Sequence, residues 1–87
     1  MFYVYIIYSH KVKKCYKGST TDLRKRISLH NNGSVRSTKF GMPWHLIYYE
    51  GFKNKVDCRR EELFLKSGKG RDRIKYLLNE TFKEIKH

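Results

Sequence analysis

The chain has 87 residues, of which 39% are hydrophobic and 15% aromatic, and 20 Lys and Arg against 8 Asp and Glu give a formal net charge of +12. This composition is too apolar for a disordered tail, and the sequence lacks the run of about 18 apolar residues that a transmembrane helix needs, so we expect one soluble domain over residues 1–87 and no membrane association. The excess of positive charge favours a polyanionic partner, above all nucleic acid, because binding to it releases counterions from the phosphates.

The first two predicted elements form a β-hairpin. Residues 2–9 are rich in Tyr, Val and Ile, and a shorter run over 15–19 follows a polar stretch, which is typical of two strands joined by a loose loop. No basic residues precede the first run and no small-residue cleavage pattern follows it, so it indicates a buried strand and not a signal peptide.

A helix is predicted over 22–31. Asp22 or the threonines before it offer an N-cap, and Leu23, Ile27 and His30 recur at helical spacing until Asn31, Asn32 and Gly33 end the pattern. Residues 33–43 have no periodicity and predict a loop.

The second half of the chain begins with a strand over 44–52, which is aromatic and aliphatic. Asn54 is a candidate N-cap for a helix over 55–67, in which Val56, Leu63 and Phe64 lie on one side. A turn at 68–70 ends that helix, and a third amphipathic helix is indicated by the apolar stripe Ile74, Leu77, Leu78, Phe82 and Ile85. The order β-β-α-β-α-α predicts an α+β fold in which a small, three-stranded, mainly antiparallel sheet is flanked by three helices.

Polar residues with chemical potential gather in the first third of the chain. If the first two strands pair, Tyr5 and Tyr16 can approach each other on one face of the sheet. Arg26 and His30 are four residues apart and share one face of their helix. Gly18 lacks a side chain and would let a backbone or a phosphate approach where that helix begins. Phenols, a guanidinium and an imidazole together suit a phosphate.

The ordered set Tyr3-Val4-Tyr5, Tyr16-Lys17-Gly18, Arg26, His30 and Asn31 resembles the signature of the GIY-YIG nucleases, which include homing endonucleases and the first nuclease domain of an excinuclease. Nearly the whole chain is covered, because several later segments resemble the small stand-alone bacterial members: Ser37-Thr38-Lys39, Pro43-Trp44, Glu50 and the run from Leu65 to Arg71. Three positions depart from the pattern: Tyr3 replaces a glycine, Lys17 replaces an aliphatic residue, and Ser19 stands where excinuclease-type domains often carry a lysine.

The resemblance implies one glutamate as the metal ligand, four residues before a lysine, which places it at Glu62 ahead of Lys66. Glu61 is the rival assignment, because one position turns a side chain by about 100 degrees around a helix. Glu62 shares a side with Cys58 and Leu65, which suits a position that faces the core.

The resemblance further implies a metal-dependent endonuclease that cuts phosphodiester bonds with Mg²⁺ or Mn²⁺ held by Glu62. Tyr5 or Tyr16 would be the general base, Arg26 would grip the scissile phosphate, and His30 would orient a tyrosine or move a proton. DNA is favoured over RNA as substrate because family members mostly act on DNA, and selection by structure in repair or recombination, or targeting by a partner protein, is expected. We expect a cytoplasmic monomer.

Further contacts with nucleic acid are predicted at Gly18 and at basic residues outside the catalytic set. These are Lys39, Lys69, Arg71 and Arg73, the last three being suited to backbone phosphates.

Each assignment has a structural alternative. His30 could stabilise the end of its helix through the helix dipole, and Glu62 could form a surface pair with Arg59 or Lys66. Aromatic residues of the third strand could stack with bases, but core packing is favoured for them: Trp44, Tyr48, Tyr49 and Phe52. The whole domain could bind nucleic acid without significant catalysis.

Two cysteines are too few for the disulfide framework of a secreted mini-protein, which favours a reducing compartment. Cys15 and Cys58 fit no compact zinc-finger spacing with His10 and His45. We expect both cysteines to be core or neutral residues.

Overall fold

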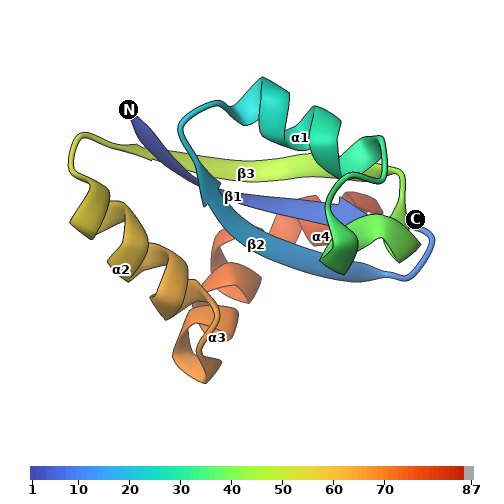
Figure 1. Cartoon of the computed structure of the whole chain (residues 1–87). Coiled ribbons are helices and arrows are strands. Elements are labelled where there is room, and N and C mark those ends of the chain that lie inside the picture. Colours follow the sequence, from blue (N-terminus) through green and yellow to red (C-terminus); the bar gives the residue numbers. More distant parts are fainter. Residues whose placement is uncertain (86–87) are drawn as a thin grey trace.

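A computed structural model of the chain, which describes residues 1–85, is built around a three-stranded sheet (Figure 1). Its strands are β1 (Phe2–Ser9), β2 (Lys14–Thr20) and β3 (Trp44–Phe52). β1 lies in the centre and pairs antiparallel with both neighbours, so the order across the sheet is β2-β1-β3. The predicted α+β fold with a small antiparallel sheet is confirmed, and β2 is one of its edges.

The helices cover the two faces of the sheet unequally (Figure 1). α1 (Leu23–Asn31) lies on one face, together with the short 3₁₀ helix η1 (Arg36–Gly41) that leads into β3. α2 (Lys55–Leu65), α3 (Gly68–Leu77) and α4 (Asn79–Ile85) lie on the other face. Among residues 1–85, no helix combines the length and the apolar character needed to cross a bilayer.

β1 contributes side chains to the hydrophobic cores on both faces of the sheet, because successive side chains of a strand point to opposite faces. Tyr5 and Ile7 pack toward α1 with Trp44. Val4 and Ile6 pack toward α2 and α3, where the other buried members are Cys58, Leu65, Ile74 and Leu78. Cys15 packs against this second core and both thiols are free, so the placement of the cysteines in the core is confirmed.

Two predicted helix N-caps are confirmed. The Asp22 carboxylate accepts a hydrogen bond from the backbone N–H of Lys25, and the Asn54 side chain accepts from the N–H of Val56. Each satisfies a donor that the first turn of a helix leaves without a partner. α1 therefore begins where the sequence indicates.

The predicted apolar side of α2 is wrong. Val56, Leu63 and Phe64 are 68%, 53% and 40% exposed, and the helix ends at Leu65, two residues earlier than expected. The side that packs on the sheet carries Cys58, Glu62 and Leu65, all buried. One of the positions facing the core is thus an acid, which hides the helical pattern from a search for apolar residues alone.

The expected turn at residues 68–70 is instead the first turn of α3, because the Ser67 side chain accepts from the N–H of Gly70 and caps the helix. A Cβ at Gly70 would lie 1.8 Å from the carbonyl oxygen of Phe64, so this glycine lets α3 begin directly against α2. The predicted third helix is also interrupted, since Leu78 leaves helical geometry at φ −109° and ψ 24°. The bend allows Phe82 of α4 to pack against the same core as Leu78.

The segment predicted as a loop over 33–43 contains η1, whose first turn is closed by the bond from the N–H of Thr38 to the carbonyl of Val35. In β3, the preference for core packing is confirmed for Trp44, which is buried, and for Tyr48 and Phe52, which pack against the core on the α2 side. It is wrong for Tyr49, which is 55% exposed.

Candidate active site

The hydroxyl of Tyr5 is the centre of a polar cluster on the α1 side of the sheet. Tyr5 is fully buried, and its hydroxyl lies 2.7 Å from Nε2 of His30. Nε of Arg26 donates to the same oxygen at 3.4 Å. Both partners come from α1, where a spacing of four residues places them on one face. The predicted proximity of Arg26 and His30 to a strand tyrosine is confirmed.

His30 extends this cluster to η1. Its Nδ1 lies 2.7 Å from Oγ1 of Thr38, whose hydroxyl donates to the carbonyl of Val35 at 3.4 Å. Oγ1 therefore accepts the proton of Nδ1, which leaves Nε2 free to accept the proton of Tyr5. Burial lowers the pKa of His30, and the charge of Arg26 lowers it further. A neutral, buried imidazole disfavours the alternative in which a charged His30 stabilises the end of α1.

Tyr16 lies on the same side of the sheet as Tyr5, as expected from the pairing of their strands. The register places Gly18 opposite Tyr5 and Tyr16 opposite Ile7. The rings of Tyr16 and Tyr5 lie 5.2 and 5.7 Å from the ring of His30. The two phenols differ in access, because Tyr16 is only half-buried. Burial raises the pKa of Tyr5, and the neighbouring Arg26 offsets part of the increase.

Gly18 of the edge strand β2 is the residue against which the Tyr5 ring packs on the α1 side. A Cβ at this position would lie 2.5 Å from the hydroxyl oxygen of Tyr5, well inside van der Waals contact. The missing side chain therefore makes room for the phenol. The space that we expected to admit a phosphate at Gly18 is occupied by Tyr5 on this side.

Glu62 is held on the opposite side of β2. It is 5% exposed, and its Oε1 accepts hydrogen bonds from Oγ of Ser19 at 2.9 Å and from Arg59 at 3.0 Å. Oε2 accepts from Nζ of Lys66 at 3.0 Å. Burial alone would raise the pKa of Glu62, but these three donors outweigh it and lower the pKa. The pairing with Arg59 and Lys66 is therefore present, although it involves a buried carboxylate and not a surface one.

The cluster around Tyr5 and the cluster around Glu62 contact neighbouring residues of β2. Tyr5 packs against Gly18 on the α1 side, and the next residue, Ser19, binds Glu62 on the α2 side. The two clusters interact electrostatically, because the negative charge of Glu62 contributes to the raised pKa of Tyr5. Because β2 is an edge strand, a ligand lying over this edge has access to both sides.

The oxygen ligands at Glu62 fit a divalent cation that keeps most of its coordination positions occupied by water. The carboxylate is ionised and the Ser19 hydroxyl adds a second hard oxygen, whereas no group of three or more His, Cys, Asp or Glu lies together within residues 1–85. Mg²⁺ commonly binds through one or two carboxylates plus substrate phosphate. The side chains of Arg59 and Lys66 are 62% and 44% exposed, so both can swing into solvent and free the carboxylate.

Glu61 points to a different part of the molecule. A hydrogen bond with Glu50 of β3, together with burial, raises the pKa of Glu61 to about 7, and the charge of Arg73 opposes this increase. Since β3 is the edge opposite β2, Glu61 lies away from the phenols. Of the two neighbouring acids, only Glu62 faces the β2 edge.

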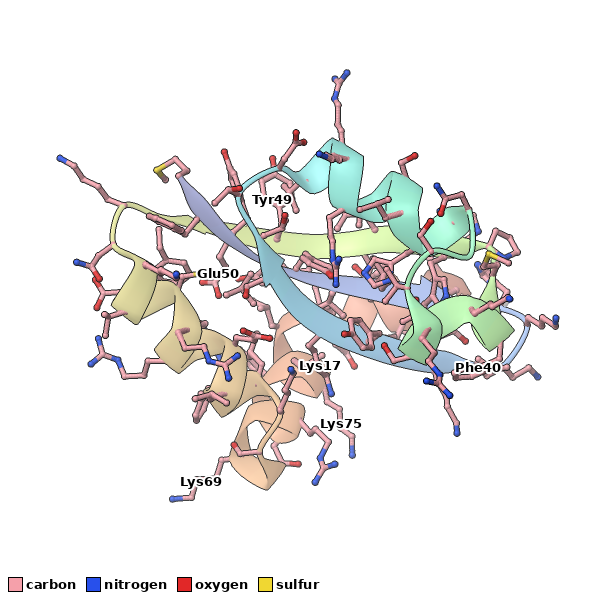
Figure 2. All side chains as sticks on the ribbon, viewed as in Figure 1. Lys17, Phe40, Tyr49, Glu50, Lys69 and Lys75 are labelled. Carbon is pink, nitrogen blue, oxygen red and sulfur yellow. The ribbon has the colours of Figure 1, made fainter. Side chains whose placement is uncertain are left out.

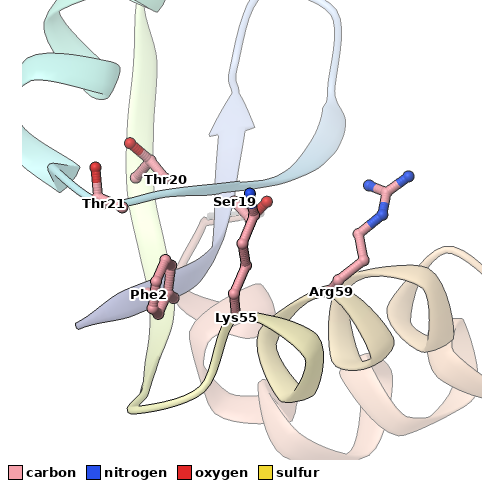
Figure 3. Close-up of a pocket in the computed structure, with 6 residues that line it drawn as sticks. All are labelled: Phe2, Ser19, Thr20, Thr21, Lys55 and Arg59. Atoms are coloured by element: carbon pink, nitrogen blue, oxygen red, sulfur yellow. The ribbon is translucent and has the colours of Figure 1, made fainter.

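A hollow of about 420 Å³ is lined in part by Ser19 and Arg59, two of the hydrogen-bond partners of Glu62 (Figure 3). Figure 3 shows Lys55 rising from α2 toward Ser19 near the end of β2, and Arg59 rising from α2 farther from that end. The walls combine hydroxyls, cations and one aromatic ring, from Phe2, Ser19, Thr20, Thr21, Lys55 and Arg59. This composition suits a segment of a phosphate-bearing ligand.

The basic residues predicted to contact nucleic acid do not form one group. Lys39 is exposed on η1, on the α1 side, and Lys69 extends from the start of α3 at the far end of the molecule (Figure 2). Arg71 lies close enough to Lys17 of β2 to lower the pKa of that lysine. Arg73 acts instead on Glu61 and lowers its pKa. Of the three α3 cations predicted, Arg71 is therefore the one that acts on a residue of β2.

Three residues of the site were not singled out from the sequence as functional. Thr38 accepts from His30, and Ser19 and Arg59 donate to Glu62. For Ser19, strand alternation was a usable signal, because it places this residue on the opposite face from Tyr16 and Gly18. For Thr38 the signal was its place in the run Ser37-Thr38-Lys39, but nothing in that run indicates His30 as its partner, which lies in α1.

The chain is similar to known proteins over most of its length. Residues 1–76 match the family model described as the GIY-YIG catalytic domain. The chain is 34% identical over 85 residues to the UPF0213 protein CPE1444 of Clostridium perfringens, covering 97% of this chain and 90% of that protein. It is 33% identical over 81 residues to the UPF0213 protein in the ldhD 5' region of Pediococcus acidilactici, covering 90% and 82%. No solved structure matches. The chain belongs to the GIY-YIG family of nucleases.

Proposed function

We propose that this protein is a metal-dependent endonuclease that hydrolyses phosphodiester bonds in DNA at the β2 edge. The observation that carries the proposal is the meeting of two clusters at Gly18 and Ser19. Tyr5 with Arg26 reaches this point from one side, and the buried, ionised Glu62 reaches it from the other. A phosphate over the edge would then have a guanidinium, a phenol and a carboxylate within reach, which is the set that phosphoryl chemistry needs.

The residues on the α1 side have separate roles. Arg26 uses one N–H on Tyr5, and its remaining donors grip the scissile phosphate. Tyr16 is the phenol that contacts the attacking water, because it is half-buried whereas Tyr5 is closed to solvent. Tyr5 and His30 hold Arg26 and the Tyr16 ring in position, and the accepting Nε2 of His30 can take the Tyr5 proton.

Glu62 would hold Mg²⁺ or Mn²⁺, with the Ser19 hydroxyl beside it. A bound divalent cation supplies Lewis-acid stabilisation of the charge that develops on the phosphoryl oxygens. Lys66 and Arg59 keep the carboxylate ionised in the absence of the cation and can turn toward the substrate when it binds.

The test is a matched pair of isosteric variants, Glu62→Gln and Glu61→Gln, assayed for cleavage with Mg²⁺ and Mn²⁺ and for binding of the same DNA. Glu62→Gln abolishes cleavage and retains most of the binding, whereas Glu61→Gln cleaves like the wild type, because Glu61 faces Glu50 at the other edge. Melting temperatures of both variants control for folding. Cleavage by Glu62→Gln at the wild-type rate would overturn the proposal.

A second candidate function is nucleic-acid binding without significant catalysis. It is favoured by the complete set of donors on Glu62, because Ser19, Arg59 and Lys66 satisfy the carboxylate without a cation. A screen of duplex, nicked, flapped, branched and single-stranded DNA and RNA at low salt distinguishes the two functions. Absence of cleavage with every divalent cation favours the binding module.

The same screen addresses the substrate. We expect structure-dependent cleavage of DNA, in repair or recombination, since the family's catalytic domain takes up most of these 87 residues and leaves few of them for sequence-specific recognition. Equal cleavage of every duplex would instead point to targeting by a partner protein.

A further inference from the structure

The hollow at the end of β2 lies where three segments distant in the sequence meet (Figure 3). Phe2 begins β1, Thr20 and Thr21 lie at the end of β2 and just after it, and Lys55 is the first residue of α2. β2 ends at Thr20, opposite Tyr3, so no residue of β2 pairs with Phe2. The sheet therefore leaves the Phe2 ring partly exposed, and this ring forms one wall of the hollow.

The Phe2 ring is held in place from the other side. It packs against the core that faces α2, and its partner across the sheet is Phe52 of β3. A nucleic-acid base is the flat partner that such an aromatic ring stacks with, whatever the identity of the base.

The polar walls of the hollow carry positive charge. Lys55 is exposed and forms no ion pair with any acid of residues 1–85. Arg59 follows it by four residues, which places the two cations on one face of α2. The hydroxyl of Thr21 adds a neutral donor. A cation and a hydroxyl together suit a backbone phosphate.

The hollow is linked to Glu62 through two side chains that it shares. Ser19 and Arg59 line the hollow, and both donate to Oε1 of Glu62, at 2.9 and 3.0 Å. A ligand in the hollow and a phosphate at Glu62 can therefore be neighbouring parts of one nucleic-acid strand.

The size and composition of the hollow fit one nucleotide. Its volume of about 420 Å³ falls within the range of roughly 300–1,000 Å³ that is typical of small-ligand sites. A site for phosphate alone would not need the ring of Phe2, and a site for an apolar ligand would not need the charge of Lys55. In a duplex the neighbouring base pairs cover both faces of each base, so only an unpaired base that has left the stack can lie on Phe2.

We propose that the hollow binds the unpaired nucleotide that flanks the scissile phosphate, with its base on Phe2 and its phosphate on Lys55 and Thr21. The inference rests on the proposed function and names the substrate class within it. This class is DNA with an unpaired nucleotide beside the cleaved bond, as at a flap or a bulge.

The experiment measures binding in the Glu62→Gln background, by fluorescence anisotropy of two labelled duplexes that differ only in one unpaired flap nucleotide. The flapped duplex should bind about tenfold more tightly, the effect of stacking one base on an aromatic side chain. Phe2→Leu should remove most of this preference, and Phe2→Tyr, which keeps the ring, should retain it. Equal affinity of the Glu62→Gln protein for both duplexes would overturn the proposal.

Phe52→Leu is the matched control for Phe2→Leu. Phe52 packs against the same core from the paired position on β3, but it lines a different hollow, together with Glu50 and Glu61. This variant should lower the melting temperature to a similar extent and keep the preference for the flap. Loss of the preference in both variants would contradict a specific contact with Phe2.

Lys55→Gln tests the phosphate contact. It should weaken binding of the flapped duplex several-fold and reduce the slope of log affinity against log salt by about 1. Lys53→Gln, at an exposed position outside the hollow, should leave the slope unchanged. An equal change of slope in the two variants would mean that Lys55 makes no specific phosphate contact.

A flap that carries the sugar and phosphate without a base separates the two parts of the site. It should lose the share of the preference that Phe2→Leu removes. If it binds as tightly as the complete flap, the hollow takes a phosphate alone and the base contact is wrong.

Because these measurements use an inactive background, failure of the nucleotide site is distinguishable from failure of the proposed function. Absence of wild-type cleavage on every substrate would remove the nuclease and leave the nucleotide site standing. Normal wild-type cleavage together with an unchanged flap preference in Phe2→Leu would remove only the nucleotide site.

Discussion

The two sides of β2 are stabilised in opposite ways. On the α1 side, Tyr5, His30 and Thr38 are all fully buried and form a chain of neutral hydrogen bonds. On the α2 side, Glu62 is ionised and is held by two cations whose own side chains are largely exposed. One side depends on close packing and satisfied polar groups, and the other depends on charge balance at the surface.

This difference predicts where substitutions will act. A neutral buried network loses stability when one member is removed, because a partner is left without a hydrogen bond. A charged group with exposed partners loses little stability, because the partners regain water, but its pKa and its chemistry change.

Gly18→Ala should have the largest effect. The new methyl group would lie 2.5 Å from the hydroxyl oxygen and 2.7 Å from Cζ of Tyr5, so the buried phenol must move and the bonds to His30 and Arg26 are disturbed. We expect a loss of about 3 kcal/mol in the free energy of unfolding, measured in urea, and loss of cleavage.

Gly68→Ala is the control for this change, because no atom lies within 4 Å of a Cβ at that position. It should alter the free energy of unfolding by less than about 1 kcal/mol. A Gly18→Ala protein as stable as the wild type would show that Tyr5 is not confined by this glycine.

Thr38→Val should come next. The change keeps the volume but removes the acceptor for the N–H of Nδ1 on His30, a residue that is fully buried. An unsatisfied buried donor costs about 2 kcal/mol, so the unfolding midpoint in urea should fall accordingly. Ser37→Ala, at the exposed neighbouring position, should be neutral. Equal stability of the two variants would contradict the buried network.

Glu61→Gln should have a smaller effect that depends on pH. The pKa of Glu61 is raised from 4.5 to about 7 by its hydrogen bond with Glu50, so the folded protein retains a proton that the unfolded chain releases between these pH values. The stabilisation is complete below the unfolded pKa and is lost as pH rises through the folded one. After allowance for solvent screening, the loss in the wild type amounts to about 1 kcal/mol.

Thermal unfolding at several pH values between these limits checks this prediction. The wild type should lose stability as the pH rises, and Glu61→Gln, which cannot ionise, should lose markedly less. If stability falls equally with pH in the wild type and in Glu61→Gln, Glu61 does not retain a proton beside Glu50.

Arg59→Ala should have the smallest effect on stability, a few tenths of a kcal/mol, because its side chain is 62% exposed. The effect on Glu62 is larger, since one of the donors that lower its pKa is removed. The pKa of Glu62 should rise, which NMR titration of its carboxyl carbon measures. Arg60→Ala, which breaks an exposed pair with Asp57, should leave it unchanged. If the pKa of Glu62 is the same in the wild type, in Arg59→Ala and in Arg60→Ala, Arg59 does not help to keep Glu62 ionised.

Much of the fold was predictable from local patterns. The run of Tyr, Val and Ile marks β1, the caps Asp22 and Asn54 mark the starts of α1 and α2, and helical spacing brings Arg26 and His30 to one face. The errors fall where a residue from another segment decides. Residues 68–70 form the first turn of α3, because Gly70 lets this helix begin directly against the backbone of Phe64 in α2.

Composition and spacing along the chain were enough to predict the three strands, the starts of α1 and α2, the strong positive charge and the ordered residues that mark the family, because each is a local property. Contacts between distant segments were needed to show that Tyr5 is closed to solvent, that Ser19 binds the predicted Glu62, and that Thr38 orients His30. These depend on contacts across 25 residues for Tyr5 and His30 and 43 for Ser19 and Glu62. Such contacts exist only once the sheet has brought distant segments together, and no periodicity in the sequence records them.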